Sequence, residues 1–276
     1  MIEHFLQFEF LRHTFYTGLL IGLIAPLLGT FLVVRRLSFL ADALSHVTLA
    51  GIAFGLFMEK RFLLIFLSPM YSGMAFSVIG AIFIEKLRSV YQSYQELGIP
   101  IVLSGGVGLS VIFIALAKGF NQDLFTYLFG SVSAVSKTDF YMILILSILV
   151  LCVVFLFYKE LVTLSFDEEH ATVSGLQTKH IHFLFIILVA FVIAASMRIV
   201  GILLVSALVT LPVAAAMRLA KSYRQLIGYS ILFGEFSVIL GLILGYYLSI
   251  PPGGTIVMIA LLILLSTILW KRKRGE

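Results

Sequence analysis

The chain has 276 residues, of which 61% are hydrophobic and only 12% are charged, with a formal net charge of +5. Soluble domains carry about 25% charged residues, so this composition excludes an ordinary soluble protein and predicts one embedded in lipid. The pI near 9.3 does not indicate nucleic-acid binding, because the basic residues are spread over short loops and the C-terminus. Cys152 is the one cysteine, which excludes a disulfide framework and a thiolate metal site.

Apolar segments of the length needed to cross a bilayer follow one another along the whole chain. We therefore expect a single all-α, polytopic membrane domain over residues 1–276, with about eight or nine transmembrane helices. The second and seventh segments are short or rich in small and polar residues. The nine segments are residues 13–34, 39–57, 62–84, 99–118, 139–158, 180–197, 200–219, 226–248 and 254–270. Residues 121–138 are amphipathic and are expected to lie at an interface or to fold back between spans.

The distribution of Lys and Arg sets the expected orientation. If the basic run 271–274 is cytoplasmic, the alternation of nine spans places most of the other basic residues on that side and the N-terminus outside. The cytoplasmic set is then Arg35, Arg36, Lys86, Arg88, Lys159, Lys179, Arg218, Lys221 and Arg224, together with the C-terminal run.

Asp42 and His46 stand four residues apart in the second apolar segment. In a helix this spacing puts both side chains on one face. A charge at membrane depth costs about 2.5–3.5 kcal/mol on insertion scales, and a carboxylate beside an imidazole suits Zn²⁺ or Mn²⁺. Two ligands are too few for a closed structural site, which fits a transport site. Structural roles stay open, with Asp42 as a helix cap or interfacial acid and His46 as a hydrogen-bonded core residue.

Glu235 is the only other one of the 14 acidic residues that is expected well inside a span. It is a candidate third metal ligand or a charge that attracts cations, and equally a candidate partner for a Ser or Arg between helices. In the seventh segment, Ser206, Thr210 and Pro212 indicate close helix packing or a broken helix along a pathway.

The segment of about 159–179 interrupts the basic trend of the cytoplasmic loops. Residues 159–176 are a candidate for one short amphipathic helix. Its acidic residues, among them Asp167, Glu168 and Glu169, are expected towards its start, which is favourable at the positive end of the helix dipole, and Gly175 can end it. An acidic helix with an exposed Phe166 is typical of a surface that fits a groove on a partner protein. An ordinary polar linker is the alternative.

Two further patterns predict no site of their own. The glycine-rich run 104–108 lacks the Lys of a phosphate-binding loop and lies inside a span, so any energy from ATP must come from another chain. His170, His180 and His182 lie in or near the cytoplasmic loop without cysteines or regular spacing. We expect these three side chains to be solvated.

Taken in order, several motifs resemble those of the zinc/manganese ABC-transporter permease family over essentially the whole chain. They are residues 29–39, 42–51, 127–131, 166–169, 200–208 with Pro212, and 251–257. The resemblance implies a fold like that of the vitamin B12-type (type II) importers and a homodimer in a bacterial plasma membrane. It also implies two copies of a separate cytoplasmic ATP-binding subunit, and an extracellular metal-binding protein or lipoprotein that delivers the ion.

By the same resemblance, Asp42 and His46 match the positions that meet the metal. Residues 169–175 are similar to the importer coupling motif Glu-Ala-Ala-x-x-x-Gly, with His170 in place of the first Ala. The residues expected to couple to the ATPase are Phe166, Asp167, Glu168, Glu169, Ala171 and Gly175. Ala41 before Asp42, and Ala50 within residues 49–51, are similar to Gram-positive zinc permeases and favour zinc over manganese.

The expected function is therefore the membrane permease of an ATP-driven importer for Zn²⁺, then Mn²⁺, then iron. We expect a transport subunit that is not itself an enzyme, holds no permanent cofactor, contacts membrane lipid and binds no nucleic acid. The alternative is a proton-coupled secondary metal transporter that works without an ATPase, in which Asp42 and Glu235 gain and lose protons. An intramembrane metalloprotease is disfavoured, because the sequence has no His-Glu-x-x-His pair.

Overall fold

The computed structural model describes residues 9–62, 68–91, 94–117, 119, 122–131 and 135–273. Parts of three expected segments lie outside the described residues: 63–67 of the third, 118 of the fourth, and 121 and 132–134 of the amphipathic segment. The N-terminal residues 1–8 and the end of the basic tail, 274–276, also lie outside them. Throughout the described ranges the chain is helical, with no strand, as the composition predicted.

The long helices coincide with the nine apolar segments that the sequence predicted. They are Glu9–Val34 (α2), Ser38–Phe62 (α3), Pro69–Val90 (α4), Gly98–Leu116 (α5), Lys137–Leu156 (α7), Thr178–Val200 (α10), Ile202–Leu219 (α11), Tyr223–Leu248 (α12) and Pro252–Lys273 (α13). Four short elements connect them: the 3₁₀ turn Gln95–Leu97 (η1), Gln122–Phe129 (α6), Tyr158–Phe166 (α8) and Glu168–Val173 (α9).

Among the described residues, eight helices are long and apolar enough to cross a membrane. The one expected span outside this set is the seventh along the chain, α11, whose apolar part, Leu204–Leu219, is shorter than the other helices. The expectation of eight or nine transmembrane helices is therefore confirmed. Pro212 lies inside α11 and has no N–H to donate, but the helix continues past it to Leu219, so α11 is not the broken helix that was one of the alternatives from the sequence.

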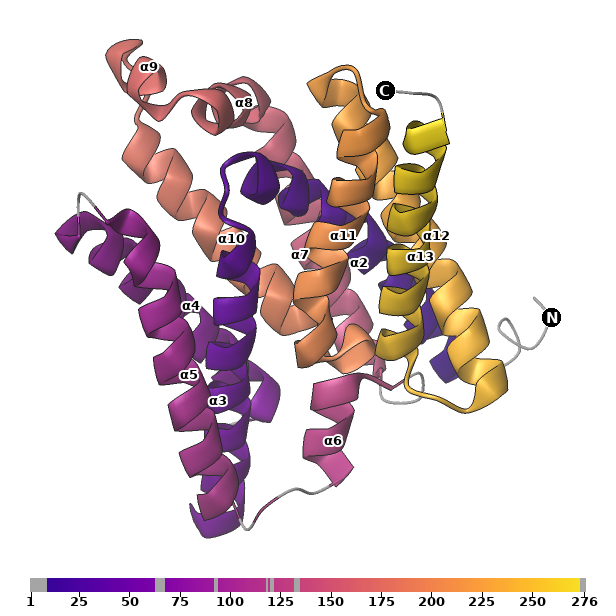
Figure 1. Ribbon diagram of the computed structural model, residues 1–276. Coiled ribbons are helices and arrows are strands. Elements are labelled where there is room, and N and C mark those ends of the chain that lie inside the picture. Colours follow the sequence, from indigo (N-terminus) through magenta and orange to yellow (C-terminus); the bar gives the residue numbers. More distant parts are fainter. Residues whose placement is uncertain are drawn as a thin grey trace.

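Successive long helices run back and forth between two ends of the bundle (Figure 1). The α2–α3 turn, α8, α9, the α11–α12 turn and the end of α13 gather at one end, at the top of Figure 1. We call it the basic end, because it carries the residues that the charge pattern grouped on one side: Arg35, Arg36, Lys86, Arg88, Lys159, Lys179, Arg218, Lys221 and Arg224. The structure thus brings together the loops that the charge pattern assigned to one face of the membrane.

Helices α2, α3 and α10 are mostly buried, whereas α5 and α13 are the least buried of the helices long enough to cross a membrane. The exposed surface is apolar. On α7, for example, Ile145, Ile148 and Phe155 are all exposed. A soluble protein rarely leaves such a continuous apolar surface uncovered, but lipid chains cover it at no cost.

At the end opposite the basic end, α6 folds back against α10, α11 and α13. Its amphipathic sequence was expected to lie at an interface or to fold back, and the described part does the second. The guanidinium of Arg198, at the end of α10, donates hydrogen bonds to Asp139 at the start of α7 and to the Tyr127 hydroxyl of α6. Asp139 also accepts from Ser136 and completes the N-terminal cap of α7. These contacts fasten three helices at this end.

Gly29 allows α2 to pass directly against the backbone of α11. A Cβ on Gly29 would lie 2.0 Å from the carbonyl oxygen of Val209, whereas a Cβ on Gly228, on the exposed face of α12, would meet nothing within 4 Å. We therefore expect Gly29→Ala to destabilise the protein by about 1–3 kcal/mol, as overpacking does. The same change at Gly228 should be neutral or slightly stabilising, because Ala is the better helix former. Thermal unfolding of the purified variants in detergent measures the difference, and equal midpoints for the two would contradict it.

Candidate functional site

Asp42 and His46 both lie on α3 and are both half-buried. Since α3 begins at Ser38, Asp42 falls in its second turn, roughly 6 Å from the helix start, and His46 lies roughly 12 Å from it at 1.5 Å per residue. Asp42 is therefore not the residue that caps α3. The predicted pairing of the two side chains on one helix turn is present, and it lies in the half of α3 that begins at the basic end.

The Asp42 carboxylate faces α11. The Ser206 hydroxyl donates a long hydrogen bond, 3.4 Å, to Asp42 Oδ1. One turn further along α11, the Thr210 hydroxyl donates to the Ser206 carbonyl at 2.9 Å, two residues before Pro212. A single long contact leaves most of the acceptor capacity of the carboxylate unused.

His46 makes no hydrogen bond to any described residue, so the structure gives no support to a hydrogen-bonded core histidine. The backbone of α3 at this point packs against α5. A Cβ on Gly106 would lie 2.9 Å from the Val47 amide nitrogen and 3.2 Å from the His46 carbonyl carbon. The backbone at His46 therefore lies at a close α3–α5 contact, and its ring nitrogens have no hydrogen-bond partner among the described residues.

Glu235 lies on α12 and faces α2. Its Oε2 is buried, has no hydrogen-bond partner among the described residues, and lies 3.3 Å from where a Cβ on Gly22 would be. From the sequence, Glu235 was also a candidate partner for a Ser or Arg between helices. No described Ser or Arg donates a hydrogen bond to this oxygen. Nowhere in the described part of the chain do three or more His, Cys, Asp or Glu side chains come close enough to hold a metal ion. One chain thus offers Asp42 and His46 as a two-ligand pair, with Glu235 placed against a different helix.

The segment 159–179, in which the sequence predicted one short helix, contains two helices. α8 ends at Phe166, and Asp167 begins α9 by accepting a hydrogen bond from the His170 amide at 2.8 Å. The acidic first turn of α9 and its end at Gly175, which has φ +84°, agree with the sequence prediction. The break at residue 167 follows from the N-cap chemistry of Asp, which the sequence reading placed within a continuous helix.

This segment presents apolar side chains to the surroundings of the basic end. Phe166 is 68% exposed, although one side of its ring contacts Tyr223, and Val173 is 88% exposed. Ala171, by contrast, is fully buried against the bundle. Val173 was not among the residues that the sequence predicted to contact a partner. The helix that carries it has only six residues, which is too short to show a periodic pattern in the sequence.

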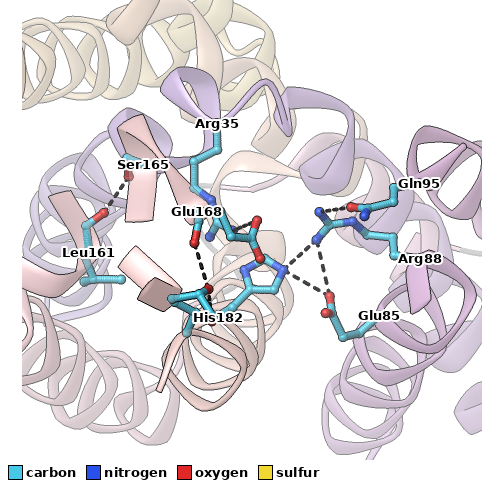
Figure 2. A network of polar contacts seen from close by, with 10 residues as sticks. Arg35, Glu85, Arg88, Gln95, Leu161, Ser165, Glu168 and His182 are labelled. Carbon is cyan, nitrogen blue, oxygen red and sulfur yellow. Dashed lines mark hydrogen bonds and ion pairs between the residues drawn. The ribbon is translucent and has the colours of Figure 1, made fainter. Parts of the chain in front are cut away.

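His182 was expected to be a solvated loop residue, and this is wrong. It lies in the second turn of α10, is 3% exposed, and its Nε2 accepts a hydrogen bond of 2.6 Å from Arg88 and lies 3.0 Å from Glu85. Figure 2 shows it between these α4 side chains and Arg35. His182 lies on the face of α10 that packs against α4, which buries it beside the polar side chains of that helix. His170 and His180 are exposed, as expected.

Residues 7–271 match the profile of the ABC 3 transport family. The chain belongs to this family. A solved structure of PsaBC from Streptococcus pneumoniae, in complex with Fab, has 30% sequence identity and a TM-score of 0.83, and the match covers 96% of this chain and 93% of that one. The high-affinity zinc uptake system membrane protein ZnuB of Haemophilus influenzae is 33% identical over 97% of this chain and 100% of its own length. The manganese transport system membrane protein MntC of Listeria monocytogenes is 31% identical over 99% and 95%.

Membership of the ABC 3 transport family confirms the resemblance read from the sequence motifs, and the all-α permease fold is confirmed with it. The relatives are bacterial membrane proteins, and the structure has eight helices able to cross a bilayer within its described residues. The chain is a multi-pass protein of the plasma membrane. Relatives named for zinc and for manganese are similar to it at nearly the same identity, so the relatives do not decide between these metals.

Proposed function

We propose that this ABC 3 family member is the permease subunit of an ATP-driven importer for a divalent transition metal, Zn²⁺ first and Mn²⁺ second. The observation that carries the proposal is the Asp42–His46 pair, one helix turn apart and half-buried within a membrane-spanning helix. The carboxylate has one long hydrogen bond and the imidazole has none to the described residues, so both are available to a metal. The names of ZnuB and MntC support the same cargo class.

Two ligands from one chain bind an ion incompletely, which supports a homodimer in which two copies line one path. The α5 surface favours this arrangement. This helix is largely exposed, it packs beside His46, and a Cβ on Gly105 or Gly108 would meet nothing within 4 Å. An α5 face of this kind allows a second copy to approach closely. Four ligands, two from each protomer, would complete a tetrahedral set of the kind that Zn²⁺ prefers. Glu235 is proposed as a further charge on the cation path, behind α2.

ATP is hydrolysed, in this proposal, by two copies of a separate subunit that dock at the basic end, which we place in the cytoplasm by the positive-inside rule. The glycines of residues 104–108 support a separate ATPase, because they lie within the continuous helix α5 rather than in a loop that could hold phosphate. The docking surface is the segment 159–179, in which Phe166, Asp167 and Glu169 are proposed to contact the ATPase. Glu168, Ala171 and Gly175 are proposed to position the segment, because Glu168 pairs with Arg35, Ala171 is buried and Gly175 ends α9. An extracellular metal-binding protein or lipoprotein delivers the ion to the opposite end.

Transport then follows from the position of the pair. The carrier releases the ion at the outer mouth, and Asp42 with His46 coordinates it transiently. ATP binding and hydrolysis in the partner subunits move the docking segment and rock the spans until the inner side opens. Both ligands must be deprotonated to bind, so they exchange protons for metal and do not trap the ion in a closed structural site.

The test is uptake by membrane vesicles that carry this permease with its ATP-binding subunit and are supplied with Zn²⁺ or Mn²⁺. We expect ATP-dependent accumulation, higher for Zn²⁺ at equal concentration, that stops when the ATPase subunit is omitted. Accumulation that continues without this subunit and follows an imposed proton gradient would instead establish the secondary transporter. A higher rate for Mn²⁺ would keep the importer and correct the order of the metals.

A further inference from the structure

An ion pair joins α9, the second helix of the proposed docking segment, to the turn between α2 and α3. We call α9 the docking helix. Glu168, in the first turn of α9, has its Oε2 3.9 Å from Nη2 of Arg35, the residue that follows the last residue of α2. Glu168 is half-exposed, whereas the Arg35 side chain is only 6% exposed. Within the described residues, no other salt bridge joins α9 to the rest of the bundle.

Arg35 is placed at an energetic cost that a surface arginine would not have. Its Nη1 is buried and has no hydrogen-bond partner among the described residues. Burial lowers the pKa of Arg35 to about 10, while the Glu168 carboxylate acts in the opposite direction. A buried guanidinium with unused donors is costly unless a carboxylate faces it, so Arg35 depends on Glu168 remaining in place.

A second cluster stands beside this pair and involves α4, η1 and α10. Arg88 donates to His182 Nε2 at 2.6 Å and to Gln95 at 3.2 Å, and Glu85 lies 3.4 Å from the Arg88 guanidinium. The charges of Glu85 and Arg88 both act on Arg35. Figure 2 shows the two groups facing each other across His182.

Both groups border hollows, so their side chains have room to shift. A cavity of about 870 Å³ is lined by Arg35 and Arg88 together with η1, and another of about 490 Å³ by Glu85, Arg88 and Glu168. A tightly packed interior moves only as a whole, whereas polar contacts beside open space can break and form again. The contacts at this end are therefore of a kind that can exist in two arrangements.

The turn that holds Arg35 passes its position directly to α3. The Arg36 amide donates to the Val33 carbonyl at 3.0 Å and the Leu37 amide to the Leu32 carbonyl at 2.8 Å. Arg36 has φ 59°, the left-handed conformation that closes such a helix end. With α3 starting at Ser38, Asp42 lies one turn beyond this hydrogen-bonded turn.

We propose that Glu168 and Arg35, supported by the Glu85–His182–Arg88 cluster, form a relay that makes the α2–α3 turn follow the docking helix α9, so that the state of the ATPase subunit reaches Asp42 through α3. This inference rests on the proposed importer function and names the contact that couples its two ends. Arg35 and Glu168 are positioning residues in this relay, because they act on the metal site only through the helices that carry them.

The experiment uses the complete complex of permease, ATP-binding subunit and carrier protein in liposomes, with Zn²⁺ as the transported ion. It measures Zn²⁺ transported per ATP hydrolysed and, separately, the amount of ATP-binding subunit that co-purifies. Glu168→Gln removes the charge at a half-exposed position without disturbing the fold. We expect it to lower the transport ratio at least about fivefold, the lower range of measured couplings between sites, with unchanged co-purification.

Charge reversal provides the specific readout. Glu168→Arg should lower the ratio further, and the swapped pair Arg35→Glu with Glu168→Arg should restore it to within about twofold of the unmodified complex, since a paired charge is recovered. Lys86→Glu on α4 makes the same charge change as Arg35→Glu at the same end, at a residue without an ion pair among the described ones, and should leave the ratio unchanged.

Each outcome decides between the two proposals. If the unmodified complex transports no Zn²⁺ and no Mn²⁺ with ATP, the proposed function fails. If it does so and Glu168→Gln keeps the full transport ratio, the relay alone is refuted. A loss of co-purification in Glu168→Gln would also refute the relay, because Glu168 would then act by holding the ATPase. The Glu168 single variants decide the question even where the buried Arg35→Glu change prevents folding.

Discussion

Replacing His46 by Ala, or Asp42 by Asn, is expected to reduce cellular Zn²⁺ accumulation at least about tenfold at unchanged abundance in the membrane. Loss of outer-shell partners of a metal ligand already costs about 10–100-fold in affinity, and loss of the ligand itself costs no less. Asp42→Asn keeps the shape of the side chain and an oxygen that can accept from Ser206, so the charge alone is removed. His46→Ala removes a ring that has no hydrogen bond to a described residue, which limits its effect on folding.

The matched control for this prediction is Ser45→Ala on the same helix. Ser45 is adjacent to His46 and buried, and its hydroxyl donates only to the Ala41 carbonyl of its own helix, at 2.8 Å. Accumulation should be unchanged in this variant. Metal content of cells grown with limiting Zn²⁺ measures the effect in all three. Normal accumulation in both His46→Ala and Asp42→Asn would return the pair to a structural role and leave Glu235→Gln as the next variant to measure.

The membrane fold could be predicted from the sequence because lipid imposes simple rules. Apolar stretches must be helical where no water satisfies the backbone, and Lys and Arg mark one side. These rules placed the nine long helices and grouped Arg35, Arg88 and Lys179 at one end. They did not predict the break at Asp167, since local capping chemistry decides between one helix and two.

The candidate site was predictable only where it depends on spacing along one helix. Asp42 and His46 share a face of α3 at four residues apart, and this required no knowledge of packing. Contacts between distant segments were not predictable, including Arg35 with Glu168 and Glu85 with His182, because a burial pattern fixes which side of a helix faces inward but not which neighbour it meets. His182 shows the limit most clearly, since its polarity favoured water and its partners came from residues almost a hundred positions away.

The second large effect is expected from Val173→Asp, which should reduce co-purification of the ATP-binding subunit at least about tenfold. Val173 is 88% exposed at the basic end. Its side chain therefore contributes little to the stability of the isolated chain, and its substitution removes almost no contact within the fold. An exposed apolar side chain at the tip of a short helix is the kind of residue that a partner's groove buries, and such anchors carry most of the energy of an interface. A charge introduced there must be desolvated without a partner.

The control is Val90→Asp, the same substitution at the same end of the bundle on α4, where Val90 is 65% exposed. It tests whether added negative charge alone repels the ATPase. If both variants co-purify normally, the docking surface lies outside the segment 159–179. If only Val173→Asp loses the ATP-binding subunit, α9 is part of the docking surface, and its acidic first turn takes part in docking as well. Glu168 and Glu169 then lie at the edge of a bound groove, and the ion pair from Glu168 to Arg35 becomes the shortest described polar path from that groove to the helix that carries the metal ligands. Arg35 is the buried member of this pair and Glu168 the half-exposed one, so a movement of α9 that withdraws Glu168 leaves a buried guanidinium without its carboxylate.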